Sequence, residues 1–296
     1  MKSEARSVQP PKFVAEVSSN HGRDLARSKR FISTAAAIGC HAVKFQLFRI
    51  QELFAPEALA ARAELRARAQ WELPPEFLPE LALHARACGI EFSCTPFYLD
   101  AVAELEPYVH FFKIASYELL WHDLLRACGA TGKPVVLSTG MAELEEIAAA
   151  VAALRDAGCR DLTLLHCVSG YPAPAEECNL AVLETLREAF PGAAVGWSDH
   201  SASDAVIHRA VHAHAAEMIE FHLDLEGEGE EFGAGHCWLP GAMRTVIEEI
   251  EAGFAAEGDR RKRPAPSERA DRDWRADPTD GLRPLRHVRA GLAEEG

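Results

Sequence analysis

Short apolar runs that end in polar or charged side chains recur along the whole chain. The run AAVGWSDH (193–200) rises to a tryptophan and then ends in Ser198, Asp199 and His200. A strand that leaves a buried core usually ends in turn residues such as Gly, Pro or Asn, so these polar ends indicate a site. Seven further runs end in the same kind of side chain: Glu16 with Asn20 and His21, Lys44 with Gln46, Ser93 with Thr95, Lys113 with Ser116 and Glu118, Ser138 with Thr139, His166 with Ser169, and Glu220 with His222.

Two lysines among these side chains predict an anion site. Lys44 and Lys113 each stand between two large apolar residues, in a chain that has seven lysines in all. A buried lysine needs an anion beside it, or its pKa falls. Two such lysines at one rim favour phosphate or carboxylate binding, and the neighbouring serine and threonine hydroxyls suit phosphate oxygens.

Two histidines, His200 and His222, end the seventh and eighth runs. Side by side, they would place two imidazoles on one divalent cation. A hydrogen-bonded structural histidine is the alternative for each of them. Asp199 and Glu220 are either outer partners of such a site or bases, and the sequence leaves both roles open.

The elements that would carry these residues alternate strand and helix eight times. The strand candidates are 13–20, 42–48, 91–97, 111–116, 134–140, 162–169, 193–200 and 218–225. Amphipathic segments lie between them, and several end at a glycine. Continuous apolar strands that alternate with helices predict a parallel sheet covered by helices, in the α/β class. Eight units favour a (β/α)8 TIM barrel, with its active site at the C-terminal ends of the strands.

A doubly wound open sheet is the alternative to the barrel. It usually carries a glycine-rich first turn, and VSSNHG is no G-x-G-x-x-G motif. Residues 1–257 are expected to form the barrel, with a long second connection at 47–74. Residues 258–296 form a basic, proline-containing tail, in which Trp274 and Leu282 predict partial docking.

The composition argues against several classes of binding partner and location. The net charge of −14 argues against nucleic acid and anionic membranes. Eight cysteines without a C-x-x-C pair favour reduced thiols in a cytoplasmic protein. The polar N-terminus has no apolar signal segment, and no apolar stretch is long enough to span a membrane.

Eight of these runs together resemble the N-acetylneuraminate (sialic acid) synthase family. In chain order they are AEVSSNHGRDL, AVKFQLF, FSCTPFYLD, FFKIASYE, KPVVLSTGMAELEEI, LLHCVSGYPAPAEECNL, VGWSDHS and MIEFHLDL, over roughly residues 12–245. The resemblance implies a metal-dependent barrel that condenses phosphoenolpyruvate with an open-chain acylamino aldose. The products would be a 2-keto-3-deoxy sugar acid and phosphate.

The resemblance also implies roles for single residues. His200 and His222 would bind the divalent metal, Mn²⁺ or Mg²⁺. Glu16 would be the base or the carboxylate that orients water, and Gln46 and Glu220 would contact metal-bound or sugar oxygens. Phosphoenolpyruvate would be held by Lys44, Thr95, Lys113, Ser116, Ser138 and Ser198, with Asn179 in the phosphate and sugar network.

The sequence departs from the family pattern in three places. Gly235-His236-Cys237 stands where the family has an acidic-His motif, and the segment EGEGEEFGAG is unusual. In the family, a C-terminal antifreeze-like domain reaches across a dimer to the acceptor, and this domain is not expected in the tail. The sequence leaves open whether the chain forms a homodimer. Two rivals therefore remain. One is a synthase for an eight- or seven-carbon keto-deoxy acid with another acceptor, and the other is a phosphoenolpyruvate-binding pseudoenzyme.

Overall fold

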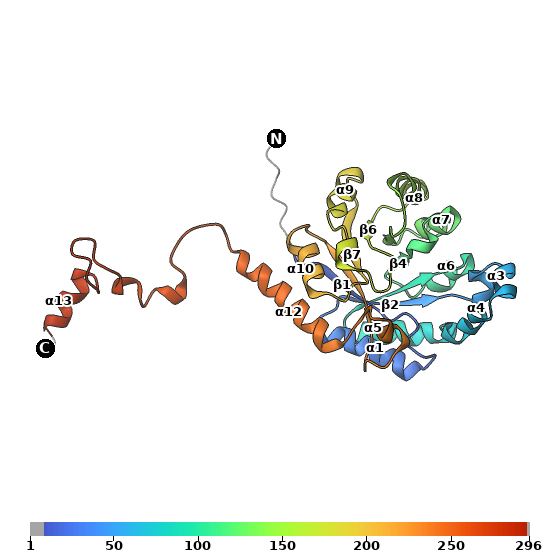
Figure 1. Ribbon diagram of the computed structural model, residues 1–296, viewed down its shortest axis with the longest axis horizontal. Helices are drawn as coiled ribbons and strands as arrows, with labels where there is room; N and C mark the ends of the chain where they lie inside the picture. The colour runs from blue at the N-terminus through green and yellow to red at the C-terminus, as the bar shows by residue number, and fades with distance from the viewer. Residues whose placement is uncertain (1–8, 295–296) are drawn as a thin grey trace. The chain divides into compact units, whose positions relative to one another are not determined.

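The computed structural model describes residues 9–294, which form two compact units, 9–254 and 255–294. The first unit is a ring of strands inside a ring of helices (Figure 1). Most of the polar N-terminal segment lies outside the described residues. No helix in the described part of the chain is long and apolar enough to cross a membrane.

Eight parallel strands close the barrel, which confirms the predicted fold. They follow one another around the ring in chain order, and β1 pairs with β8 to close it. Their bounds are β1 Lys12–Glu16, β2 Ala42–Leu47, β3 Glu91–Pro96, β4 Phe111–Ile114, β5 Val135–Ser138, β6 Leu162–His166, β7 Ala194–Asp199 and β8 Met218–Leu223. A ninth strand, β9 (Cys237–Trp238), pairs with β8. With two residues it is too short to leave a pattern in the sequence.

The helices outside the ring follow the predicted alternation. They are α1 Leu25–Ala37, α5 Leu78–Ala87, α6 Leu99–Leu105, α7 His122–Ala130, α8 Leu144–Asp156, α9 Val182–Ala189, α10 Asp204–His212 and α12 Pro240–Glu257. In α8, buried Ile147, Val151 and Leu154 recur every three or four residues, and Glu143 begins the helix with a capping box. Gly158 follows at φ +106°, a conformation that favours glycine.

The interior of the barrel changes from apolar to polar along the strands. Val14, Ala42, Phe111 and Met218 belong to one buried apolar cluster near the strand starts. Side chains two residues apart share a face of a strand, so the next inward positions after these four are Glu16, Lys44, Lys113 and Glu220. Strand register sets Glu16 opposite Lys44, and Ser198 opposite Glu220. The fold therefore places the predicted charges inside the ring, toward its C-terminal mouth.

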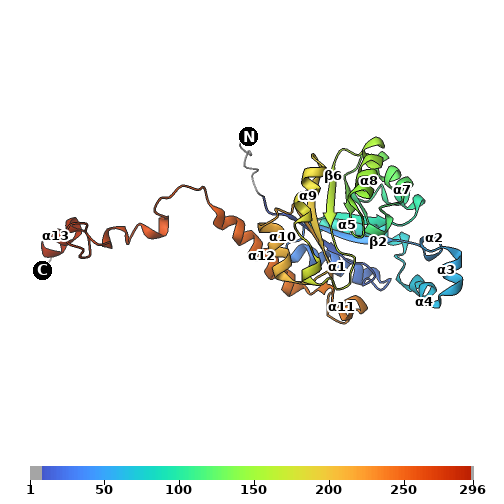
Figure 2. The same cartoon turned by 45° about the horizontal axis from the view of Figure 1, so that its top comes forward.

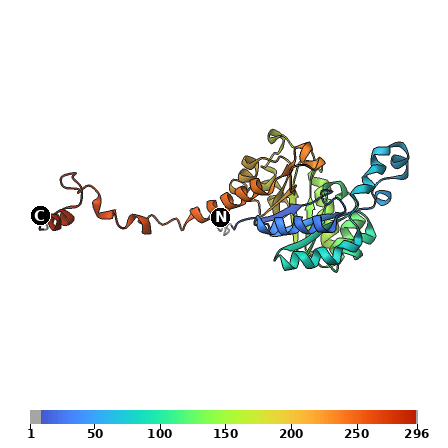
Figure 3. The ribbon, with the colours of Figure 1, turned by 90° about the horizontal axis from the view of Figure 1, so that it is seen from below.

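Two strand-to-helix connections are long. After β2 come α2 Ile50–Leu53, α3 Pro56–Ala61 and α4 Ala63–Ala67, and this segment stands away from the barrel body (Figures 2 and 3). The predicted helical stretch in the second connection is therefore present, but as short helices. After β8 the chain forms α11 (Glu230–Ala234) and then β9.

The second unit contains two 3-10 turns and α13 (Arg286–Glu294). Asp277 organises it by accepting backbone N–H bonds from Thr279 and Arg286, each at 2.9 Å. Trp274 and Leu282 are exposed. Partial docking of this tail remains a prediction.

Candidate active site

Four charged side chains from four strands form a buried cluster inside the barrel mouth. Glu16, Lys44, Lys113 and Glu220 are each 3% exposed or less. Lys44 Nζ forms ion pairs with Glu16 Oε2 and, at 3.3 Å, with Glu220 Oε1. Lys113 Nζ donates to the same Glu220 oxygen at 3.0 Å. We call these four residues the charge cluster. Its two positive and two negative charges offset one another.

The two lysines of the charge cluster differ in their electrostatics. Burial disfavours the charge of Lys44, but Glu16 and Glu220 outweigh it and raise its pKa above the ordinary value. Burial outweighs the single carboxylate beside Lys113, so the pKa of Lys113 is lowered. Burial opposes ionisation of Glu220, yet Lys113 and Lys44 together hold its pKa below the ordinary value. An anion that enters must compete with the two carboxylates for these ammonium groups.

Neutral polar groups surround the charge cluster at hydrogen-bond distance. Gln46 Nε2 donates to Glu16 Oε1 at 2.9 Å, and the Ser18 backbone N–H donates to the same oxygen at 2.8 Å. Ser198 Oγ donates to Glu220 Oε1 at 3.3 Å, and Lys44 Nζ lies 3.5 Å from Thr95 Oγ1. Glu16 is therefore held on one oxygen, while its other oxygen faces Lys44.

Further hydroxyls lie at the ends of β4, β5 and β6. Ser116 Oγ accepts from the Gly140 backbone N–H at 3.0 Å and contacts Cys167 Sγ at 3.1 Å. Ser138 Oγ and Ser169 Oγ are buried and have no hydrogen-bond partner among the described residues. A buried hydroxyl without a partner is costly, so both are free to bind oxygens of an incoming anion.

Asn179 lies apart from these contacts. It is exposed, with φ +41°, in the turn after residues 175–177. No hydrogen bond joins its side chain to another described residue. The family motif alone supports its predicted role.

The structure brings His200 and His222 together, with their ring centroids 5.3 Å apart. His200 Nδ1 donates to the Val168 carbonyl at 2.7 Å, which leaves Nε2 as the lone-pair nitrogen of the neutral ring. Burial lowers the pKa of His200 to about 3, and His222 adds to that shift. Tyr171 packs against both rings, with centroids 4.2 and 6.1 Å away.

A second set of groups able to hold a metal ion includes His222. His222, Glu231, His236 and Cys237 offer ligand atoms that all lie within 4.8 Å of one another. His222 Nδ1 and Glu231 Oε2 are 2.9 Å apart. Glu231 and Cys237 were not among the residues predicted from the sequence. The available signal was the spacing of Glu231, in the unusual segment after β8, to His236 and Cys237 directly behind that segment.

Asp199 has a structural role. Its carboxylate accepts from the indole N–H groups of Trp197 and Trp238, both at 3.0 Å. Ser201 Oγ donates to it at 2.6 Å and the Ala202 N–H at 3.1 Å. Because these donors occupy both of its oxygens, Asp199 links the end of β7 to β9 at the barrel mouth.

Glu118 is a further buried acid near the charge cluster. It is 8% exposed, and its Oε2 has no hydrogen-bond partner among the described residues. Burial raises its pKa to about 7, which Lys113 opposes. A carboxyl group with such a pKa exchanges a proton near neutral pH.

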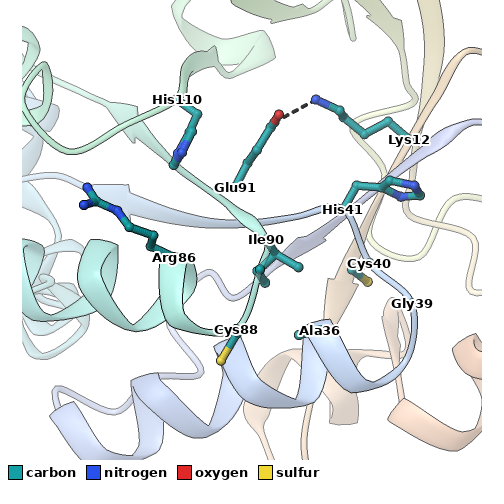
Figure 4. A pocket seen from close by; sticks show the side chains of 11 residues that line it. Lys12, Ala36, Gly39, Cys40, His41, Arg86, Cys88, Ile90, Glu91 and His110 are labelled. Carbon is teal, nitrogen blue, oxygen red and sulfur yellow. Dashed lines mark hydrogen bonds and ion pairs between the residues drawn. The ribbon is translucent and has the colours of Figure 1, made fainter.

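A hollow of about 670 Å³ lies at the other end of the barrel, where the strands begin. Lys12 and Glu91 pair across it at 2.7 Å, and Arg86 and Cys88 line it from the end of α5 (Figure 4). None of the predicted site residues lines this hollow. In barrels of this type catalysis takes place at the opposite end, where the charge cluster lies.

Known proteins resemble this chain over most of its length. The model of the NeuB family matches residues 31–262. The N,N'-diacetyllegionaminic acid synthase of Campylobacter jejuni is 35% identical, over 86% of this chain and 80% of that protein. The pseudaminic acid synthase of Helicobacter pylori is 32% identical, over 86% and 78%. The crystal structure of the N-acetylneuraminic acid synthetase of Leptospira borgpetersenii, a citrate complex, superposes with a TM-score of 0.78 at 28% identity. It covers 93% of this chain and 95% of that one.

Proposed function

The chain belongs to the NeuB family of phosphoenolpyruvate-dependent synthases, and we propose that its acceptor is the open-chain aldehyde of an acylamino sugar. Two relatives are named as synthases of legionaminic and pseudaminic acid, and a structural neighbour as one of N-acetylneuraminic acid. These names differ in the product. The comparisons therefore support the reaction class, and the acceptor is our proposal.

The charge cluster is the observation that carries the donor half of the proposed reaction. Lys44 and Lys113 are two buried ammonium groups inside one barrel mouth, and the donor brings a phosphate and a carboxylate. Glu16 and Glu220 balance these charges inside the protein, and an entering anion would compete with them for the same ammonium groups. We assign Lys44 and Lys113 to the two anionic groups of phosphoenolpyruvate. The hydroxyls that complete the donor site are Thr95, Ser116, Ser138 and Ser198, and Asn179 is a predicted contact to the phosphate and sugar network.

The carboxylates of the cluster act on water and on the acceptor. Gln46 and the Ser18 N–H fix one oxygen of Glu16, so its other oxygen orients water toward C2 of the donor once Lys44 turns to the anion. Glu220 holds Lys113 and Ser198 in place and faces the acceptor oxygens. Positioning by these groups is expected to supply much of the rate.

The residues at the mouth fit a divalent ion. His200 has a lone-pair nitrogen and is neutral, and the ring of His222 packs against it. We propose that these two histidines bind the ion, for which the family resemblance implies Mn²⁺ or Mg²⁺. A bound ion of this kind supplies Lewis acidity that polarises the aldehyde oxygen of the acceptor.

The overall reaction consumes one water. C3 of phosphoenolpyruvate bonds to the aldehyde carbon, whose oxygen takes up a proton. Water held by Glu16 bonds to C2 and loses both of its protons in turn, one of which balances the proton taken up by the aldehyde oxygen while the other leaves with the phosphate, as the bond between C2 and the phosphate oxygen breaks. Lys44 and Lys113 retain the leaving phosphate and the carboxylate. The products are a 2-keto-3-deoxy sugar acid and inorganic phosphate.

Phosphate release tests this proposal. The protein is incubated with phosphoenolpyruvate, Mn²⁺ and single acceptors from a panel of acylated amino-hexoses and simple aldoses. We expect release with an acylamino hexose, and loss of that release in Glu16→Gln. Glu80→Gln on the outer helix α5, which makes the same exchange at an exposed carboxylate, is the matched control. Release with simple aldoses alone would replace the proposed acceptor class. Binding of the donor without release under any condition would favour a pseudoenzyme.

A further inference from the structure

We give the name thiol cluster to His222, Glu231, His236 and Cys237, which come together where β8 pairs with β9. Glu231 Oε2 lies at its centre. This oxygen is 2.9 Å from His222 Nδ1, 3.6 Å from His236 Nε2 and 3.9 Å from Cys237 Sγ. Ligand atoms around a tetrahedral zinc ion are roughly 3.3–3.8 Å apart, given bonds of about 2.0–2.3 Å. The cluster is therefore close to the spacing that one such ion imposes.

Outer contacts hold the acidic ligand and the thiol in place. Ser19 Oγ donates to Glu231 Oε1 at 2.8 Å, which leaves Oε2 to the cluster. Asn20 Nδ2 lies 3.9 Å from Cys237 Sγ and donates to the Leu223 carbonyl at 3.1 Å. Such outer partners orient metal ligands in proteins. The other nitrogen of His236, Nδ1, is buried without a hydrogen-bond partner among the described residues, so no such bond fixes that ring in another orientation.

The backbone between β8 and β9 is shaped to present Glu231. Asp224 accepts from the N–H groups of Glu226, Gly227 and Gly229, at 2.9, 2.7 and 3.2 Å. A Cβ on Gly229 would lie 2.2 Å from Asp224 Oδ2, so only glycine fits directly before α11. Gly235, at φ +96°, ends that helix and leads into His236 and Cys237. The unusual segment thus brings Glu231, and the His236 and Cys237 that follow it, to His222.

We propose that the thiol cluster binds one thiophilic divalent ion, Zn²⁺ or Co²⁺, through the Cys237 thiolate together with His222, Glu231 and His236. Thiolate and imidazole ligands favour these ions over Mn²⁺ and Mg²⁺, which prefer oxygen. The thiolate and the carboxylate offset the two charges of the ion in a buried place. His222 belongs to both sets and has two ring nitrogens, so the ion of the thiol cluster, on the Nδ1 side that faces Glu231, is distinct from the ion proposed beside His200. The inference therefore goes beyond the proposed function and does not rest on it.

Spectroscopy of the Co²⁺ protein tests the ligand set without any substrate. The metal-free protein, without a histidine tag, is titrated with Co²⁺ and its absorption spectrum is followed. We expect visible bands of a four-coordinate ion and a near-ultraviolet thiolate-to-Co²⁺ band. In Cys237→Ser the near-ultraviolet band should vanish and Co²⁺ affinity should fall by at least the 10–100-fold known for loss of an outer partner. Cys88→Ser, which removes a partly exposed thiol at the far end of the barrel, should keep both.

Two further measurements keep the inference falsifiable where Cys237→Ser does not fold. Zn²⁺ should protect Cys237 of the wild-type protein from alkylation, as read by peptide mapping, and Mn²⁺ at equal concentration should not. Glu231→Gln should weaken Co²⁺ binding by a similar factor and keep the thiolate band at saturation. A wild-type protein without a thiolate band, or equal protection by Mn²⁺, would overturn the inference. Absence of phosphate release with an intact band would reject the proposed function and leave the ligand set standing.

Discussion

Replacing Lys113 by Met removes one of the two buried charges that we assign to the donor. The methionine keeps an apolar stem of similar length, so the packing inside the barrel should survive. Lys113 Nζ has one carboxylate partner, Glu220 Oε1, at 3.0 Å. The same oxygen also faces Lys44 Nζ and Ser198 Oγ, each at 3.3 Å. Glu220 therefore keeps partners in the variant.

The expected magnitudes follow from these contacts. Removing one partner of a buried ion pair costs about 3–5 kcal/mol where the other charge is left alone. Because Lys44 and Ser198 remain on Glu220, we expect a loss of unfolding free energy of about 3 kcal/mol or less. Hydrogen bonds to charged groups contribute about 1.5–3 kcal/mol. Loss of the Lys113 contact to the donor should therefore raise its dissociation constant by about 10- to 150-fold.

Two measurements separate binding from stability. Calorimetric titration with phosphoenolpyruvate gives the dissociation constant, and urea unfolding gives the free energy of unfolding. Lys29→Met is the matched control, because it removes the same charge from a surface pair with Glu80 on the outside of the barrel. We expect the control to change neither quantity by more than a few tenths of a kcal/mol, as for an exposed ion pair.

The assignment would be refuted by unchanged donor affinity in Lys113→Met and in Lys44→Met, provided that both variants are folded. That result would place the donor outside the charge cluster. A loss of affinity equal to that of the control would show a long-range effect of net charge. A loss only in Lys44→Met would leave Lys113 with a structural role toward Glu220.

Three further predictions concern other parts of the site. Burial raises the pKa of Glu118 from 4.5 to about 7, so its protonation stabilises the fold below pH 4.5, and this contribution is lost as the pH rises through 7. The pH-dependent part of the free energy of unfolding should be about 3 kcal/mol, and Glu118→Gln should remove it. Urea unfolding at a series of pH values measures this, and an unchanged pH profile in the variant would contradict the prediction. Chelation, or His200→Ala, should abolish phosphate release and leave calorimetric donor binding in place; full activity after chelation would refute the metal requirement. Deleting residues 270–296 should raise the acceptor KM or lower kcat at constant donor affinity and Tm, and unchanged kinetics would show that the tail does not serve the acceptor.

The barrel and the charge cluster could be predicted from the sequence because the spacing of apolar and charged residues along each strand indicates both. A lysine between two large apolar residues must lie on the opposite face of a strand from them, and in a closed barrel one face is the interior. That reasoning found Lys44 and Lys113. It could not find that Lys44 pairs with two carboxylates and Lys113 with one, because this depends on how the strands are staggered around the ring.

The thiol cluster and the role of Asp199 could not be predicted in the same way. Glu231 lies in α11, a five-residue helix inside a glycine-rich connection, and so short a helix shows no periodicity in the sequence. Its approach to His222 depends on Asp224, which holds three N–H groups of that loop. In the sequence, Asp199 was a candidate base or outer partner of a metal site. In the structure its carboxylate accepts a hydrogen bond from the indole of Trp238, which lies on β9, a two-residue strand that the sequence did not predict. Both cases depend on contacts made after β8.

The donor groups and the thiol cluster lie on parts of the fold that differ in how freely their sequence can vary. The donor groups sit on strands, where register fixes each side chain against its neighbours, and a change at Lys44 or Glu220 disturbs the buried charge balance. Glu231, His236 and Cys237 sit on a connection after β8, and such loops tolerate variation. A barrel of this kind can therefore keep one donor while its acceptor and metal preferences change with the loop. The proposed thiolate ligand would be one such change, made without altering any strand of the ring.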